Sequence, residues 1–234
     1  MDSTPTSLGR GPLKKFEAVE VGVFLLFILP SMIFSATIPK SAGLSFPVVA
    51  ASTMLSSIPL MCLVLYFVWR NGEPFRAIGL FFRNPPKEAV IGIALFVPLL
   101  IVMGLVGKIL RAAGLSVPQT APSFLIPKGS GQVTLALFML VVVAFCEEVI
   151  FRGYLIRRFS HLFQSPVVAL LLSSALFALG HGYERSGGAV GVGILGLIFG
   201  AIYLWRKTLV APMVMHFIQD FVGMILVPLG LFSS

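Results

Sequence analysis

The sequence predicts an all-α, polytopic transmembrane helix bundle with about seven to eight spanning helices, and two observations carry this prediction. Of the 234 residues, 57% are hydrophobic and 11% are charged, and the mean hydropathy is +1.00. A soluble domain has roughly a quarter of its residues charged. The apolar residues are also gathered into long runs, and a helix needs roughly 20 mainly apolar residues to cross a bilayer. The chain is therefore expected to be an integral, multi-pass membrane protein.

Runs with the length and composition of membrane spans occur throughout the chain. They are residues 21–38, 46–69, 89–110, 133–156, 166–182, 189–205 and 209–227. The first run is longer than the ~7 to 15 apolar residues of a secretory signal, so it is expected to be retained as a helix. The last run leaves the two ends of the chain on opposite sides of the membrane.

Three regions follow from this pattern. Residues 1–15 are polar and are expected to form a flexible cytoplasmic tail, residues 16–132 hold the N-terminal transmembrane helices, and residues 133–234 form the C-terminal transmembrane region. Within the second region, residues 74–86 mix aromatic and basic side chains, which is typical of a short helix in the membrane interface. Residues 111–132 contain several prolines and are expected to be an irregular outer loop.

The distribution of Lys and Arg predicts the orientation of the chain. Counted on alternate sides of the spans, most basic residues share the side of the N-terminus. They are Arg10, Lys14, Lys15, Arg70, Arg76, Arg83, Lys87, Arg157, Arg158, Arg206 and Lys207, against Lys40, Lys108, Arg111, Lys128 and Arg185 on the other side. Because cytoplasmic loops carry the excess of Lys and Arg, the N-terminus is placed in the cytoplasm. The net charge of +8 is spread over these breaks, which favours the lipid bilayer over nucleic acid as its partner, and in a prokaryote the membrane would be the plasma membrane.

Ionisable side chains inside three of the runs give the strongest functional signal. They are Glu147, Glu148, Arg152, His181, His216 and Asp220. An ionisable group at the bilayer centre costs at least ~2.5 to 3.5 kcal/mol, so such groups mark functional sites by default. The structural alternative is a set of buried ion pairs that only fix helix register.

The fourth run places two adjacent glutamates and one arginine near its end. Glu148 and Arg152 are four residues apart and share a helix face, so they are expected to pair. Glu147 is rotated by roughly 100° from its neighbour and is left without that partner. Glu147 is therefore the candidate general base.

The fifth and seventh runs each contribute a histidine. Phe177 lies one turn before His181, and His216 and Asp220 are four apart on one face. Each pair alone also fits simple packing, but three helices that direct polar groups into one interior favour a hydrated catalytic cavity. Phe177 and Phe151 are expected to line it.

Other protease chemistries lack their residues in this chain. There is no HExxH zinc motif, no second intramembrane aspartate for an aspartyl dyad and no GxSxG nucleophile turn. Ser173 and Ser174 precede His181 by about two turns, too far for a direct Ser and His couple. The chemistry that remains is the activation of a water molecule by glutamate and histidine.

The three motifs, taken in order, resemble the CPBP family. EExxxR is formed by Glu147, Glu148 and Arg152, FxxxH by Phe177 and His181, and HxxxD by His216 and Asp220. This family contains the type II CAAX prenyl proteases and the bacterial Abi-type proteases, and the resemblance covers residues 135–227.

The resemblance implies an intramembrane endopeptidase. Glu147 would activate water with His181, His216 and Asp220 would stabilise the oxyanion, and Glu148 with Arg152 would orient Glu147. The family's last motif often ends in Asn, whereas the carboxylate of Asp220 cannot donate a hydrogen bond unless it is protonated. The substrate would be a membrane-associated protein or peptide, lipid-modified as in the CAAX proteases, in a cavity open toward the cytoplasm.

The cofactor is left unknown by the sequence, because family members are described both as metalloproteases and as metal-free enzymes. Glu147, His181 and His216 are the candidate ligands, and zinc is the divalent metal that such a set would suit. Partners that orient a ligand histidine are scarce in the sequence, Asp220 being the evident one, which weighs against an obligatory metal. A proton-coupled transporter and a non-catalytic membrane scaffold stay open as alternatives.

One geometric requirement accompanies the proposed site. At ~1.5 Å per residue from the cytoplasmic ends of the runs, Glu147 lies about 14 Å deep, His216 about 10 Å and His181 about 22 Å. A single site requires these levels to converge, through tilted or broken helices or different helix ends.

Overall fold

The computed structural model describes residues 10–37, 43–82, 84–118 and 120–231, and these form a helical bundle, as the sequence predicts. The α-helices are α1 (Arg10–Ser35), α2 (Phe46–Arg70), α3 (Pro85–Ala112), α4 (Gly129–Glu147), α5 (Ile156–Phe163), α6 (Pro166–Gly180), α7 (Arg185–Arg206) and α8 (Val210–Phe221). Two π-helical segments, Glu148–Leu155 and Val222–Leu226, continue α4 and α8. Of the expected tail, residues 1–9 lie outside the described residues, and α1 already begins at Arg10.

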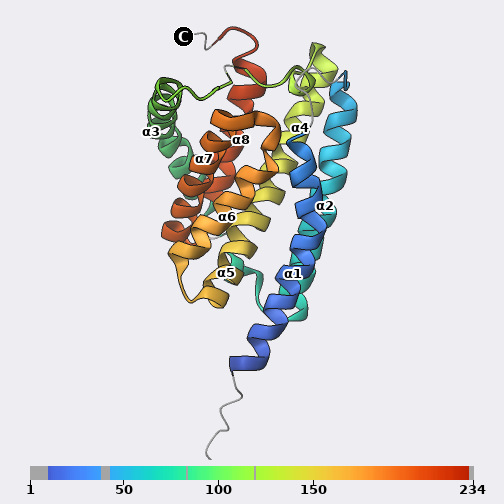
Figure 1. Ribbon diagram of the computed structural model, residues 1–234, viewed down its shortest axis with the longest axis vertical. Helices are drawn as coiled ribbons and strands as arrows, with labels where there is room; N and C mark the ends of the chain where they lie inside the picture. Colours follow the sequence, from blue (N-terminus) through green and yellow to red (C-terminus); the bar gives the residue numbers. More distant parts are fainter. Residues whose placement is uncertain (1–9, 38–42, 83, 119, 232–234) are drawn as a thin grey trace, which may run out of the picture.

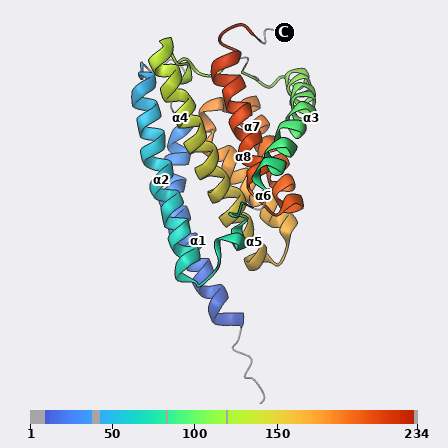
Figure 2. The same cartoon turned by 180° about the vertical axis from the view of Figure 1, so that it is seen from behind.

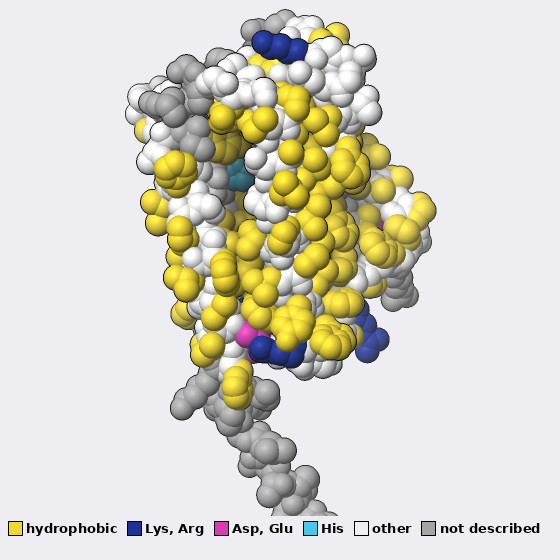
Figure 3. Space-filling view, turned by 90° about the vertical axis from the view of Figure 1, so that its right-hand side faces the viewer, with side chains coloured by type: hydrophobic (Ala, Val, Ile, Leu, Met, Phe, Trp, Pro, Cys, Tyr) yellow, Lys and Arg dark blue, Asp and Glu magenta, His cyan; other side chains and the backbone are white. Residues whose placement is uncertain are grey.

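Long apolar helices account for most of the predicted spans. Within the described residues, five helices are long and apolar enough to cross a membrane: Phe16–Ser35, Phe46–Arg70, Pro85–Ala112, Gly129–Phe163 and Ser186–Arg206. The two shorter apolar helices, Pro166–Gly180 and Val210–Leu226, correspond to the fifth and seventh predicted runs. The space-filling view in Figure 3 shows hydrophobic side chains over most of this face of the molecule between its two ends. The chain is therefore an integral membrane protein.

The helices are arranged so that α4 and α8 lie inside the bundle. Helix α2 packs along α4, α8 packs against α3, α4 and α7, and α6 lies between α5 and α7. Figures 1 and 2 show α1 and α2 together on one side and α3 on the other. The start of α1 and the C-terminal end of α8 lie at opposite ends of the bundle (Figure 1), in agreement with an odd number of crossings.

The fourth span is longer than its apolar run. It continues without a break through α4, the π-helical segment and α5 to Phe163, rather than ending at Ile156. Helix α8, in contrast, starts from a turn inside the bundle, where the Leu209 amide donates a hydrogen bond to the Gly79 carbonyl at 3.1 Å. These two features bring Glu147 and His216 to one level. Of the run ends from which the depths were counted, only that of the fourth run, at Ile156, differs from its helix end at Phe163, whereas α6 and α8 begin at Pro166 and Val210.

The segment 74–86 contains a short helix, as the sequence predicts, and its place in the membrane interface stays a prediction. Phe75–Ile78 forms one 3₁₀ turn in which Ile78 is fully buried, and α3 begins at Pro85. Gly79 follows with φ of +77°, which favours glycine. A Cβ atom at Gly153 would lie 2.8 Å from the Ile78 carbonyl oxygen, so the close approach of this turn to the fourth span requires a glycine there.

An ionic cluster ties the N-terminal helices to α5 at the end of the bundle where α1 begins. The guanidinium of Arg158 is fully buried, and it lies 2.5 Å from Glu73 and 3.5 Å from Glu17. Arg157 adds a 2.6 Å contact to Glu73, and Arg70 pairs with Glu20. The cluster joins α1, the end of α2 and α5, which stand far apart in the sequence.

Acidification is expected to destabilise the protein through Glu73. Burial alone would raise the pKa of this carboxyl, but the Arg158 and Arg157 guanidiniums outweigh it and hold the pKa below its ordinary value of 4.5. A depressed pKa gives a stabilising contribution that is complete above pH 4.5 and is lost as the pH falls through the folded-state pKa. The thermal midpoint in detergent should therefore fall more steeply below about pH 5 for the wild type than for Glu73→Gln. Parallel pH curves for the two proteins would contradict this role of Glu73.

Candidate active site

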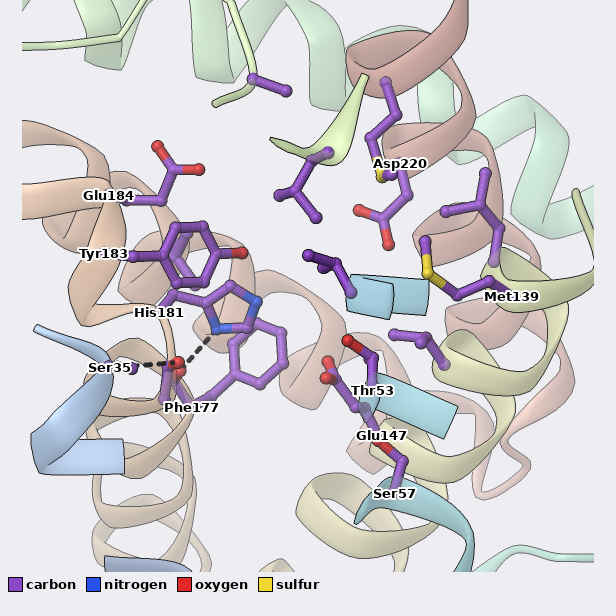
Figure 4. A pocket seen from close by; sticks show the side chains of 18 of the residues that line it. Ser35, Thr53, Ser57, Met139, Glu147, Phe177, His181, Tyr183, Glu184 and Asp220 are labelled. Atoms are coloured by element: carbon purple, nitrogen blue, oxygen red, sulfur yellow. Dashed lines mark hydrogen bonds between the residues drawn. The ribbon is translucent and has the colours of Figure 1, made fainter. Parts of the chain in front are cut away.

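A cavity of about 930 Å³ lies between the N-terminal helices α1 and α2 and the part of the bundle formed by α4, α6, α7 and α8. Its walls include Glu147, His181, His216 and Asp220, together with Phe151 and Phe177. The polar residues that the sequence singles out on three separate spans thus meet at one place, apart from Glu148 and Arg152, which lie behind the cavity wall. Figure 4 shows His181 on one side of the cavity and Glu147 and Asp220 on the other.

Glu147 presents its carboxylate to the cavity from the last residue of α4. Its side chain is 19% exposed, and Oε2 lies 3.7 Å from Nε2 of His216. Thr53 and Ser57 of α2 lie beside it in Figure 4. Among the described residues, Oε2 of Glu147 has no hydrogen-bond partner. The carboxylate is therefore placed to bind a water molecule or a substrate group.

Glu148 points away from the cavity and is fully buried. Its Oε1 atom lies 2.9 Å from Nη1 of Arg152, as the spacing of four residues predicts, and 2.8 Å from Nδ1 of His216. Glu148 therefore bridges Arg152 and His216. The contacts of Glu148 reach Glu147 through His216, whose Nε2 lies 3.7 Å from Oε2 of Glu147, and the orienting role of Glu148 and Arg152 stays a prediction.

Aromatic rings surround this buried ion pair. The guanidinium of Arg152 lies 4.1 Å from the centroid of the Phe177 ring, a cation–π contact that compensates part of its burial. The Phe177 ring also packs edge-on against Phe151 at 5.1 Å and lies 4.7 Å from the ring of His181. Phe177 and Phe151 line the cavity, as expected, and Phe177 also supports the histidine above it.

Both histidines are oriented through their Nδ1 atoms. In His181 this atom lies 2.9 Å from the Phe177 carbonyl oxygen, and since a carbonyl only accepts, Nδ1 carries the proton. In His216 it donates to the Glu148 carboxylate at 2.8 Å. The Nε2 atom of His216 then lies 3.4 Å from Oδ2 of Asp220 as well as near Glu147. Each histidine thus has a partner that orients its ring: a backbone carbonyl for His181 and a carboxylate on another helix for His216. The sequence does not reveal either partner.

The candidate metal ligands do not converge into a metal site. Within the described part of the chain, no group of three His, Cys, Asp or Glu side chains is placed so that it could hold a metal ion. Oriented histidines suit a metal centre in principle, but the positions of Glu147, His181 and His216 do not fit one. The chemistry of the site is therefore derived from its side chains alone.

The π-helical segment that follows Glu147 has no evident signal in the sequence. A π-helix shifts the backbone hydrogen bonds of a helix, and such segments occur often at functional sites. Here the carbonyl of Phe151 accepts a 2.6 Å hydrogen bond from the buried Ser173 hydroxyl of α6. Ser173 therefore serves the fold, in keeping with its distance from His181 along the helix.

Tyr183 is a cavity residue that the sequence motifs miss. It lies in the short turn Gly182–Glu184 after α6, and its ring stands 5.8 Å from that of His181. Burial, together with the negative charges of Glu184, Asp220 and Glu147, raises the pKa of its phenol well above the ordinary value. The feature of the sequence that points to Tyr183 is its position two residues after His181.

The cavity lies toward one end of the bundle. Its lining includes Pro118, Thr120 and Phe124 of the loop before α4 and Tyr183 of the turn after α6, whereas the turns at the basic end do not contribute. With the N-terminus in the cytoplasm, this end is the outer one, so the two expectations of a cytoplasmic N-terminus and a cavity open toward the cytoplasm exclude each other. Lys40 and Arg83, which enter the charge count, lie outside the described residues.

The cavity also reaches the lipid-facing surface between α1 and α2. Both helices line it, α1 through residues such as Met32 and Ser35 and α2 through Thr53 and Ser56. Figure 3 views this side of the molecule and shows a hollow in which a histidine side chain is visible. A membrane-held chain could therefore reach the polar residues sideways.

Comparison with known proteins agrees with this geometry. The family model for the type II CAAX prenyl endopeptidase Rce1-like domain matches residues 129–222, which include every motif residue of the site. The comparisons with curated proteins and with solved structures give no match. Residues 129–222 are thus similar to the type II CAAX prenyl endopeptidase Rce1-like domain, and this similarity supports a relationship to the CPBP family of CAAX-type proteases.

Proposed function

We propose that the protein is an intramembrane endopeptidase that hydrolyses a peptide bond of a membrane-associated substrate with a water molecule activated by Glu147 and His181. The observation that carries this proposal is the free carboxylate of Glu147, which faces His181 across the cavity while Arg152 is paired with Glu148. A carboxylate near an imidazole and open to water can act as a general base. An ion-pair cluster that only fixed helix register would not require this second glutamate, which does not pair with Arg152.

The steps follow from the positions of the side chains. Glu147 takes a proton from water, and the oxygen attacks the carbonyl carbon of the scissile bond, with His181 holding the water through Nε2. Negative charge develops on the carbonyl oxygen, and stabilising that charge is generally the largest contribution to such catalysis. When the C–N bond breaks, the proton passes from Glu147 to the leaving amine. His216, held by Glu148, adds positive potential beside Glu147.

A membrane-associated peptide with a lipid modification is the proposed substrate. The opening between α1 and α2 faces lipid, and the apolar residues that line both helices suit an acyl or prenyl chain. The hydroxyls of Ser52, Thr53 and Ser56 follow one side of α2 along the cavity and can pair with the backbone of an extended peptide.

Quantitative proteomics of membranes would test the proposed function. Cells that produce the wild type or Glu147→Gln at equal levels are compared, with Glu73→Gln as the matched control far from the cavity. Peptides with new C-termini should appear in the wild type and the control, and be missing in Glu147→Gln. Identical profiles in all three would favour a scaffold or a transporter, whose proton uptake in liposomes would then be measured.

The orientation of the chain is expected to place the cavity on the outer side of the membrane. A reporter fused after Lys207 or within 76–87 should be cytoplasmic, and one within 117–129 should be external, because basic residues accumulate on the cytoplasmic side. Alkaline phosphatase and fluorescent protein fusions distinguish the two. The reverse pattern would place the N-terminus outside and open the cavity to the cytoplasm, the side from which a cytoplasmic CAAX-type substrate would enter.

A further inference from the structure

We infer that Tyr183 is a catalytic residue, whose hydroxyl donates a hydrogen bond to the oxyanion and so supplies the donor that Asp220 lacks. This inference rests on the proposed peptidase function, and it adds to that function a residue outside the three motifs. Three observations lead to it: the place of Tyr183 in the cavity wall, the chemistry of Asp220, and the neighbours of the phenol ring.

Tyr183 belongs to the same cavity as the motif residues. The turn Gly182–Glu184 carries it directly beyond His181 at the end of α6. In Figure 4 its hydroxyl points from the His181 side into the cavity, toward the side that carries Glu147 and Asp220. A carbonyl held between Glu147 and His181 for attack would therefore have the phenol beside it.

Asp220 is poorly suited to the role that the family resemblance gives it. Its carboxylate lies 3.4 Å from Nε2 of His216. An ionised carboxylate has no proton to donate and repels a developing oxyanion. In this chain the position where the family often has Asn thus holds an acceptor, so a donor must come from another residue.

The surroundings of the phenol ring allow it to act without movement of the fold. The ring contacts His181 at 5.8 Å and Phe124 at 6.3 Å between centroids, so its plane is held from two sides. A phenol is protonated at neutral pH, because its ordinary pKa is ~10. Tyrosine hydroxyls are among the side-chain donors that form oxyanion holes.

Tyr183→Phe tests this inference, because it removes the hydroxyl and keeps the ring. Cleavage of an internally quenched peptide with a C-terminal prenyl-cysteine and three further residues is measured in detergent, where both ends of the protein are accessible. We expect kcat to fall about 10² to 10³-fold with little change in KM, as for the loss of one oxyanion donor. Tyr203→Phe, which alters a buried tyrosine of α7 outside the cavity, should retain wild-type kcat.

Asp220→Asn in the Tyr183→Phe background distinguishes donation from packing. An amide at position 220 restores a donor, so kcat of the double variant should exceed that of Tyr183→Phe alone by about tenfold, a coupling that two independent sites would not show. A fall in kcat that Asp220→Asn does not relieve would mean that Tyr183 only positions His181, and would overturn the inference. An unchanged kcat, or a change confined to KM, would overturn it as well.

The wild type and Glu147→Gln are run in the same assay. Cleavage by the wild type and none by Glu147→Gln leaves the proposed function standing whatever Tyr183→Phe does. If the wild type shows no cleavage that depends on Glu147, the proposed function and the role of Tyr183 fail together.

Discussion

Glu147→Gln is expected to abolish peptide cleavage while leaving the folded protein intact. The amide keeps the size of the side chain but cannot take a proton from water, and general-base catalysis contributes about 10² to 10⁴-fold to the rate. Turnover of the prenylated peptide by the purified variant should therefore fall by at least ~10²-fold. Its thermal midpoint in detergent should remain near that of the wild type, since Glu147 forms no ion pair with Arg152.

Ser57→Ala is the matched control for this loss. Ser57 lies beside Glu147 in the cavity, so its replacement alters the local hydration without removing a base. Most of the activity should persist in this variant. Turnover by Glu147→Gln at a rate close to the wild type would mean that another group activates the water, and the mechanism would have to be reassigned.

Glu148→Gln is expected to lower stability strongly, in contrast to the same change one residue earlier. Glu148 is fully buried between Arg152 and His216, and Arg152 is only 1% exposed. Removing the carboxylate leaves the guanidinium as an unpaired charge inside the bundle. Breaking a buried ion pair in this way typically costs ~3 to 5 kcal/mol.

The comparison of the two neighbouring variants provides the measurement. The thermal midpoint of Glu148→Gln in detergent should lie clearly below that of Glu147→Gln. Activity should fall as well, because His216 loses the carboxylate that orients its ring. Replacing both members of the pair, in Glu148→Gln with Arg152→Gln, should recover part of the lost stability. Equal midpoints for the two single variants would show that the ion pair contributes little to the fold.

The sequence by itself predicted the class of the fold and the polar motif residues that meet in and behind the cavity, though not Tyr183. Composition and run length favour membrane helices, because a continuous run of ~20 apolar residues can satisfy its own backbone hydrogen bonds within a bilayer as a helix. The cost of an ionisable group in the same environment singles out Glu147, Glu148, Arg152 and the two histidines. The pairing of Glu148 with Arg152 is equally local, since residues four apart share a helix face whatever surrounds the helix.

Only the tertiary structure decided how these residues work together. His216 contacts Glu148 because α4 and α8 are placed so that these two residues lie at the same level of the bundle. This placement depends on the continuation of the fourth span to Phe163 and on the start of α8 at a turn inside the bundle. The packing of the helices also places Tyr183 at the cavity and places the cavity toward one end of the bundle. Each of these features arises from contacts between segments far apart in the chain, where the helical periodicity of any one segment carries no information about its neighbours.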